Sequence, residues 1–172
     1  MALIFTICLQ IRDYPAALEE IARVLRPGGL FLSCEWNRHM AFHPELQQVP
    51  SVDAPAAVRF MDAITDALAS RGIQPIADQI PTFLEDSGYF TQITVGKKYI
   101  PLGDWPSDLA FKSIGADCLK MHERYADSCK PLLLEVGWGE VASERLITDY
   151  IEEIRSVSGL VDIIFTVHAR RI

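Results

Sequence analysis

Residues 21–36 decide the fold of this chain, and they read IARVLRPGG followed by LFLSCEW. The first part ends an amphipathic helix, because apolar residues recur at helical spacing over Leu18, Ile21, Ala22 and Leu25. Pro27 cannot continue a helix, and the glycine after it can take the left-handed conformation that ends one. The apolar run that follows lacks polar alternation, which indicates a strand covered on both faces. The sequence therefore predicts a helix, a two-glycine stop and a central strand over residues 30–36.

A second segment repeats this arrangement. Residues 83–93 read FLEDSGYFTQI, which predicts a short helix, a glycine cap, an aromatic residue and a strand. Asp13 is placed to cap the helix that runs to about Leu25. A longer amphipathic helix is predicted over residues 54–70, and a closing strand over residues 160–169.

These segments, in this order and spacing, resemble the passages before the fifth and sixth strands of class I S-adenosylmethionine-dependent methyltransferases. Asp13 is similar to the acid that opens the helix after the family's strand four. The wider match includes residues 34–36 and the stretch from Tyr89 onward, and it is typical of a secondary-metabolism-type subgroup. The resemblance implies a partial Rossmann-like, doubly wound α/β sheet, the C-terminal half of the family's fold. It also implies S-adenosyl-L-methionine as cofactor and a small-molecule acceptor.

The family's cofactor site comes mainly from its first half, where a Gly-rich turn follows strand one and an acid ends strand two. No glycine precedes Gly28 in this chain. Three βα units, or roughly 100 residues, are missing if each unit takes about 30 or more. The sequence therefore predicts a truncated methyltransferase, and we expect the 172-residue chain alone not to methylate an acceptor.

The resemblance also predicts the strand order. Residues 160–169 should run antiparallel beside residues 30–36, with residues 91–99 outermost. The chain is expected to form a single domain. Its sheet and flanking helices should come from residues 1–104 and 157–172, and residues 105–156 should form a helical cap over the carboxyl ends of the strands. Residues 37–53 are expected to form an irregular loop.

Two apolar stripes predict how the helical cap packs. One repeats at spacings of three and four: Phe111, Ile114, Cys118, Met121 and Tyr125. The other consists of Ile147, Tyr150, Ile151 and Ile154. Both should face neighbouring elements.

Candidate catalytic residues follow from the rule that doubly wound sheets bind ligands beyond the carboxyl ends of their strands. Glu35 and His39 are the candidates, because a carboxylate or an imidazole can take a proton from the nucleophile about to be methylated. Trp36, Arg38 and His43 are expected on the substrate side. The alternative is that Glu35 is a paired acid at the strand end and that the loop residues are solvated.

Three residues are cofactor candidates by resemblance alone. Thr6, Ile7 and Gln10 match positions that flank the methionine half of the cofactor after strand four. They cannot bind it without the missing half, and the alternative is an exposed N-terminal segment. His39 and His43 have helical i,i+4 spacing, but there is no His-Glu-x-x-His pattern and Pro44 opposes a helix, so no metal site is predicted.

A permuted cofactor site is a further alternative, because residues 132–139 read LLLEVGWG like a strand and a glycine turn. Val141 stands where a third glycine should let the backbone approach a cofactor, and Trp138 crowds the turn. Arg170 and Arg171 follow the last strand in place of an acid. The same stretch also fits the helical cap.

Composition narrows the classes of function. The chain has 49% hydrophobic and 23% charged residues, which is typical of one globular domain. A net charge of −7 argues against nucleic-acid binding. Its four cysteines have no CxxC spacing and are expected to be reduced thiols, mostly buried. The apolar run at residues 2–9 is too short to span a membrane, and a cytoplasmic location is expected, with a nuclear one as the alternative.

Two hypotheses of function remain. The first is a small-molecule methyltransferase, or its C-terminal part. The second is a catalytically inactive remnant that acts as a protein-interaction module, because a missing half would leave a sheet edge exposed for self-association or another partner. Titration with S-adenosylmethionine discriminates between them.

Overall fold

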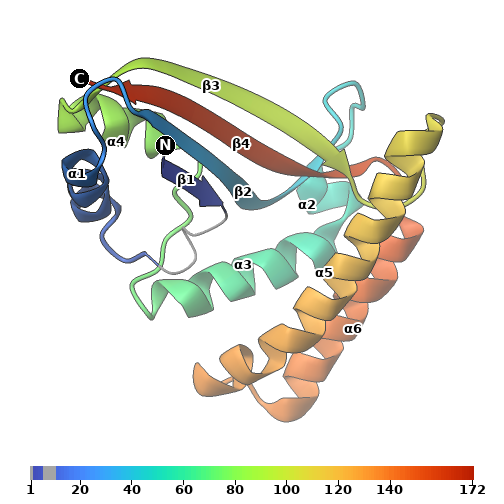
Figure 1. Ribbon diagram of the computed structural model, residues 1–172. Coiled ribbons are helices and arrows are strands. Elements are labelled where there is room, and N and C mark those ends of the chain that lie inside the picture. Colours follow the sequence, from blue (N-terminus) through green and yellow to red (C-terminus); the bar gives the residue numbers. More distant parts are fainter. Residues whose placement is uncertain (1, 6–10) are drawn as a thin grey trace. The chain divides into compact units, whose positions relative to one another are not determined.

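The computed structural model describes residues 2–5 and 11–172 (Figure 1). Within this part the elements in chain order are β1 (Ala2–Phe5), α1 (Tyr14–Val24), β2 (Leu30–Phe42), α2 (Pro50–Asp53), α3 (Pro55–Ala69), α4 (Ile80–Ser87), β3 (Phe90–Pro101), α5 (Leu109–Glu135), α6 (Glu140–Ser156) and β4 (Leu160–Arg171). The chain divides into two compact units. The first contains residues 11–37, 72–98 and 164–172 together with β1, and the second contains residues 38–71 and 99–163.

The strands form one sheet in the order β1-β2-β4-β3. β1 pairs with β2 in parallel, with Ala2 opposite Phe31 and Phe5 opposite Cys34. Parallel neighbours require a crossover, and here the connection contains α1.

β4 runs antiparallel to β2, as two backbone hydrogen bonds at opposite ends of β2 establish. Near the start of β2, the Gly28 amide donates to the Arg171 carbonyl at 2.8 Å. Just past the end of β2, the His43 amide donates to the Gly159 carbonyl at 2.8 Å. The start of one strand therefore lies beside the end of the other. β3 lies on the far side of β4, so the predicted order of the last three strands is confirmed.

The core of the first unit lies under α1 and α4. Asp13 caps α1 as predicted, because its Oδ1 accepts a hydrogen bond from the Ala16 amide at 3.0 Å. Phe31 of β2 contacts Phe90 of β3, with ring centroids 5.5 Å apart. The buried residues of this core are Tyr14, Leu18, Ala22, Leu25, Phe31, Ile76, Ile80, Leu84, Phe90, Val167 and Ala169.

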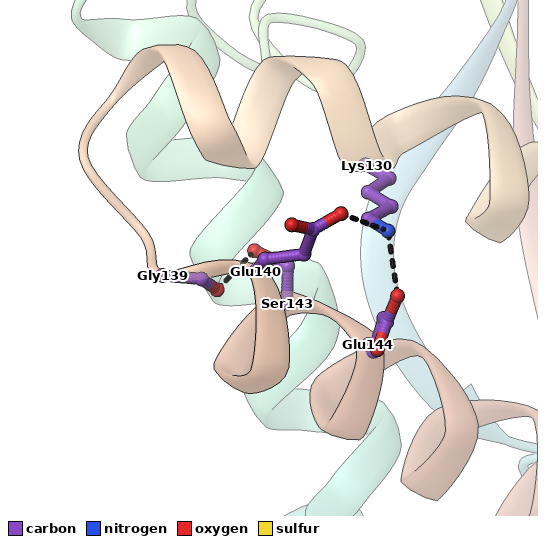
Figure 2. A network of polar contacts seen from close by, with 5 residues as sticks. All are labelled: Lys130, Gly139, Glu140, Ser143 and Glu144. Carbon is purple, nitrogen blue, oxygen red and sulfur yellow. Dashed lines mark hydrogen bonds and ion pairs between the residues drawn. The ribbon is translucent and has the colours of Figure 1, made fainter.

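The second unit contains α3, α5 and α6, which pack against one another. Phe60 of α3 stacks on Tyr150 of α6 at a centroid distance of 4.1 Å. The turn from α5 to α6 is tied by Lys130, whose Nζ lies 3.2 Å from Glu140 and 2.7 Å from Glu144 (Figure 2). Because exposed ion pairs contribute only about 0–1 kcal/mol, buried packing holds these helices together.

The loop predicted for residues 37–53 is wrong, since β2 continues to Phe42 and α2 occupies Pro50–Asp53. The predicted loop contained Pro44 and Pro50, but its first residues extend the strand, and Arg38 is buried there. Met40 and Phe42 then continue the alternation of buried positions with a period of two.

The first apolar stripe of the cap was also predicted wrongly. Phe111, Ile114 and Met121 are each about half exposed, and only Cys118 of that stripe is fully buried. α5 instead buries a different face: Gly115, Cys118, His122, Ala126, Cys129 and Leu133. A Cβ on Gly115 would stand 2.0 Å from the Gly103 carbonyl oxygen, so this helix face approaches the chain after β3 too closely for a side chain.

The remaining features of residues 105–156 agree with the prediction in part. They are mostly helical, residues 130–135 lie in α5, and Ile147, Tyr150 and Ile154 are buried. The position of these helices over the strand ends, and the single-domain organisation, stay predictions. Over residues 2–5 and 11–172, no helix has the length and apolar character needed to cross a membrane.

Candidate functional site

Four buried side chains with reactive groups meet in the second unit. Cys118 and His122 lie on α5, Tyr150 on α6 and Asp162 on β4. His122 and Tyr150 are 0% exposed, Asp162 is 4% and Cys118 is 8% exposed. Because Cys118 and His122 are four residues apart in a helix, both side chains leave the same face. Three consecutive elements thus build one buried polar cluster from residues up to 44 positions apart in the sequence.

His122 stands at the centre of this cluster. Its Nε2 lies 2.8 Å from Asp162 Oδ2, and its Nδ1 lies 2.5 Å from the Tyr150 hydroxyl oxygen. A neutral imidazole has one donor and one acceptor, so we assign the proton to Nε2, where it is donated to the carboxylate. Nδ1 then accepts from the Tyr150 hydroxyl. Cys118 Sγ donates to the same Asp162 oxygen at 3.3 Å.

Burial decides the protonation of the thiol and the phenol. It raises the pKa of the Cys118 thiol well above its usual value, and the nearby charge of Asp162 raises it further. Burial followed by the same charge also raises the pKa of the Tyr150 hydroxyl. Both groups therefore keep their protons at neutral pH and act as hydrogen-bond donors. The cluster can hold a proton or, through its sulfur, nitrogen and oxygen atoms, bind a metal ion.

Glu35, Trp36 and Arg38 lie within β2 and not at its carboxyl end, because the strand runs on to Phe42. Glu35 is 1% exposed and Arg38 is 3% exposed. Each of the three side chains has at least one polar or ring contact. The burial alternation shifts by one residue between Glu35 and Arg38, which is why both are buried despite their odd spacing. Their catalytic and substrate-side roles stay predictions.

His39 and His43 have different surroundings. His39 is exposed and borders a cavity of about 250 Å³, which Met40, Pro50, Ser51, Val58, Met61 and Asp62 also line. His43 contacts the rings of Tyr99 and Trp105 at centroid distances of 6.0 and 5.9 Å. Since His39 lies in a strand and His43 follows it directly, the helical pairing considered for a metal does not occur.

The cofactor candidates Thr6, Ile7 and Gln10 lie outside the described residues, so their role stays a prediction. The permuted cofactor site is wrong, because residues 132–135 end the helix α5 and form no strand. Gly137 follows that helix with a φ of 93°, which only closes the turn into α6.

Sequence reasoning missed the buried cluster, although two signals for it were present. Cys118 and His122 have i,i+4 spacing in a stretch predicted as helical. Asp162 is the one charged residue in the apolar run LVDIIF. A lone acid in an apolar strand requires a buried partner, and that requirement pointed to a polar cluster.

Searches of protein-family models and of curated proteins find no match to this sequence. Among solved structures, the chain is similar to Haemonchus contortus phospholethanolamine N-methyltransferase 2 in complex with phosphomonomethylethanolamine and S-adenosylhomocysteine. The sequence identity is 16% and the TM-score is 0.45. The similarity covers 98% of this chain and 32% of that protein, so the chain spans about a third of its length.

Proposed function

We propose that this chain is the C-terminal, acceptor-side portion of a small-molecule methyltransferase that uses S-adenosylmethionine. One observation carries the proposal: β4 runs antiparallel between β2 and β3, while β1 is parallel to β2. This order was expected from the sequence resemblance to class I methyltransferases, and it is specific because β4 is last in the chain but is inserted between two earlier strands.

The two motifs behind the resemblance support the same proposal. The stretch before β2 ends α1 and turns at Gly28, which has a φ of 73°. The stretch before β3 ends α4 at Gly88, a left-handed cap with a φ of 67°. Gly88 caps its helix directly, whereas α1 already ends at Leu25 and Gly28 turns the chain into β2 three residues later.

The donor site is not supplied by this chain's described residues. No glycine precedes Gly28 in the sequence, and Gly137 and Gly139 follow a helix rather than a strand. The described residues therefore do not form a site for S-adenosylmethionine by themselves. The contribution proposed for this chain is to hold the acceptor and exclude water, since methyl transfer depends on alignment of donor and acceptor. Glu35 and His39 remain candidate bases.

Binding of S-adenosylmethionine tests the proposal when two proteins are compared by calorimetry. One is the 172-residue chain, and the other carries the cofactor-binding half of a class I methyltransferase ahead of β1. We expect micromolar binding by the extended protein and none at millimolar ligand by the chain alone. The matched control is the extended protein carrying Ile4→Pro, in which proline removes a backbone donor from β1 and should weaken both the pairing of β1 with β2 and the binding of S-adenosylmethionine. A folded extended protein that does not bind would contradict the proposal.

A second candidate function is a protein-interaction module. It is favoured by the position of β1 at one end of the strand order, where only β2 pairs with it among the described residues. An unpaired edge offers backbone donors and acceptors to another chain. If the protein self-associates and the Ile4→Pro variant of the 172-residue chain is monomeric, this second function is supported.

A further inference from the structure

We propose that Cys118, His122 and Asp162 form a zinc-binding site in the second unit, independent of the methyltransferase proposal. Their candidate ligand atoms, Sγ, an imidazole nitrogen and a carboxylate oxygen, all lie within 4.8 Å of one another. A thiolate, an imidazole and a carboxylate are the three kinds of ligand that zinc takes in proteins.

The distances between the ligand atoms suit one ion after a small adjustment. Zinc–ligand bonds of about 2.0–2.3 Å in a tetrahedron place neighbouring ligand atoms about 3.3–3.6 Å apart. Cys118 Sγ and Asp162 Oδ2 are already 3.3 Å apart. His122 Nε2 and Asp162 Oδ2 are 2.8 Å apart, so they would separate by roughly 0.5 Å to coordinate zinc.

The surroundings of His122 also match those of a metal ligand. Histidines that bind metals usually bond their other ring nitrogen to a neighbouring group, which fixes the orientation of the ring. Tyr150 supplies that bond to Nδ1 at 2.5 Å, and the hydroxyl can rotate to accept once Nδ1 carries the proton. Nε2 is thereby directed at the carboxylate and the thiol.

Charge balance favours a buried zinc ion here. When the Zn–S bond forms, the thiol proton leaves to water, and zinc, one thiolate, one carboxylate and a neutral imidazole then sum to zero. A neutral site costs less to bury than a charged one. The sulfur and nitrogen ligands select against magnesium and calcium, which prefer oxygen. A water molecule would complete four-fold coordination.

Cobalt(II) is the probe of choice, because its bond to a thiolate gives a charge-transfer absorption in the near ultraviolet. Chelator-stripped full-length protein should develop this band until one equivalent of cobalt has been added, where the absorption should level off, and zinc should remove it. Cys118→Ser should lose the band. Cys129→Ser should keep it, because Cys129 is equally buried on α5 but lies beside Tyr125 and Ser128, outside the cluster.

A second pair of variants keeps the test decisive if Cys118→Ser does not fold. A protein with serine at Cys8, Cys34 and Cys129 retains only Cys118 and must still give the band. Tyr150→Phe should weaken zinc binding by about 10–100-fold, the usual effect of losing a partner of a metal-bound histidine. No band in the wild-type protein, or an equal band in Cys118→Ser, would overturn the proposal and leave the cluster as a hydrogen-bond network only.

Discussion

Replacing His122 by alanine should destabilise the protein strongly. His122 is 0% exposed and bonds both Asp162 and Tyr150. A hydrogen bond to a charged group contributes about 1.5–3 kcal/mol and one between neutral groups about 0.5–1.5 kcal/mol. The cavity left by the ring adds to these losses, so we expect the free energy of unfolding to fall by about 3–5 kcal/mol. For a chain of this length, the melting temperature should drop by about 6–20 °C.

Equilibrium unfolding in urea, with a chelator present, measures this loss. His168→Ala is the matched control, because His168 is exposed on β4 and its removal should cost less than about 0.5 kcal/mol. Tyr150→Phe, alone and combined with His122→Ala, completes a double-mutant cycle whose coupling should exceed about 0.5 kcal/mol. A loss below about 1 kcal/mol for His122→Ala, or additive effects in the cycle, would refute the bridging role of His122.

Asp13→Ala should lower the free energy of unfolding, measured by chemical denaturation, by about 0.5–2 kcal/mol because the α1 cap is lost. Asp86→Ala, on the exposed side of α4, should not lower it, and equal losses in the two variants would contradict the cap. Gly115→Ala should lower the free energy of unfolding by about 1–3 kcal/mol, because the added Cβ would meet the Gly103 carbonyl oxygen. Gly139→Ala is the control, since its Cβ would meet nothing within 4 Å, and an unchanged melting temperature for Gly115→Ala would contradict the close approach. Burial, and then the charge of Glu35, raise the pKa of the Cys34 thiol, so less of it is thiolate at pH 8. Its alkylation, measured by mass spectrometry, should therefore be slower in the folded than in the denatured protein, and equal rates would contradict the raised pKa.

Local signals were sufficient for the parts of the fold that depend on neighbouring residues. The cap at Asp13, the left-handed turn at Gly28 before β2 and the Gly88 cap before β3 each follow from the conformation of a few residues, although α1 ends at Leu25 and not at a glycine. The antiparallel placement of β4 did not follow from local signals. It was predicted through the family resemblance, which supplied long-range order that periodicity cannot provide.

The errors arose where tertiary contacts override local pattern. α5 buries Gly115 and His122 in place of Phe111 and Met121, because a close backbone approach and a polar cluster select small and hydrogen-bonding residues for that face. The predicted strand ended at Trp36, six residues before the end of β2, because the stretch from Asn37 to the prolines at 44 and 50 has no local signal for a strand. The partners of His122, on α6 and β4, are 28 and 40 residues away in the sequence, beyond the reach of spacing rules.

Transfer of a labelled methyl group from S-adenosylmethionine to a panel of phenol, carboxylate and amine acceptors tests whether this chain is the acceptor-side part of a methyltransferase. We expect transfer by the protein extended with a cofactor-binding half, and none by the 172-residue chain above a boiled control, because a donor misplaced by only about 1 Å can cost on the order of 100-fold in rate. Methyl transfer by the 172-residue chain alone, or none by a folded extended protein that binds the donor, would contradict the account.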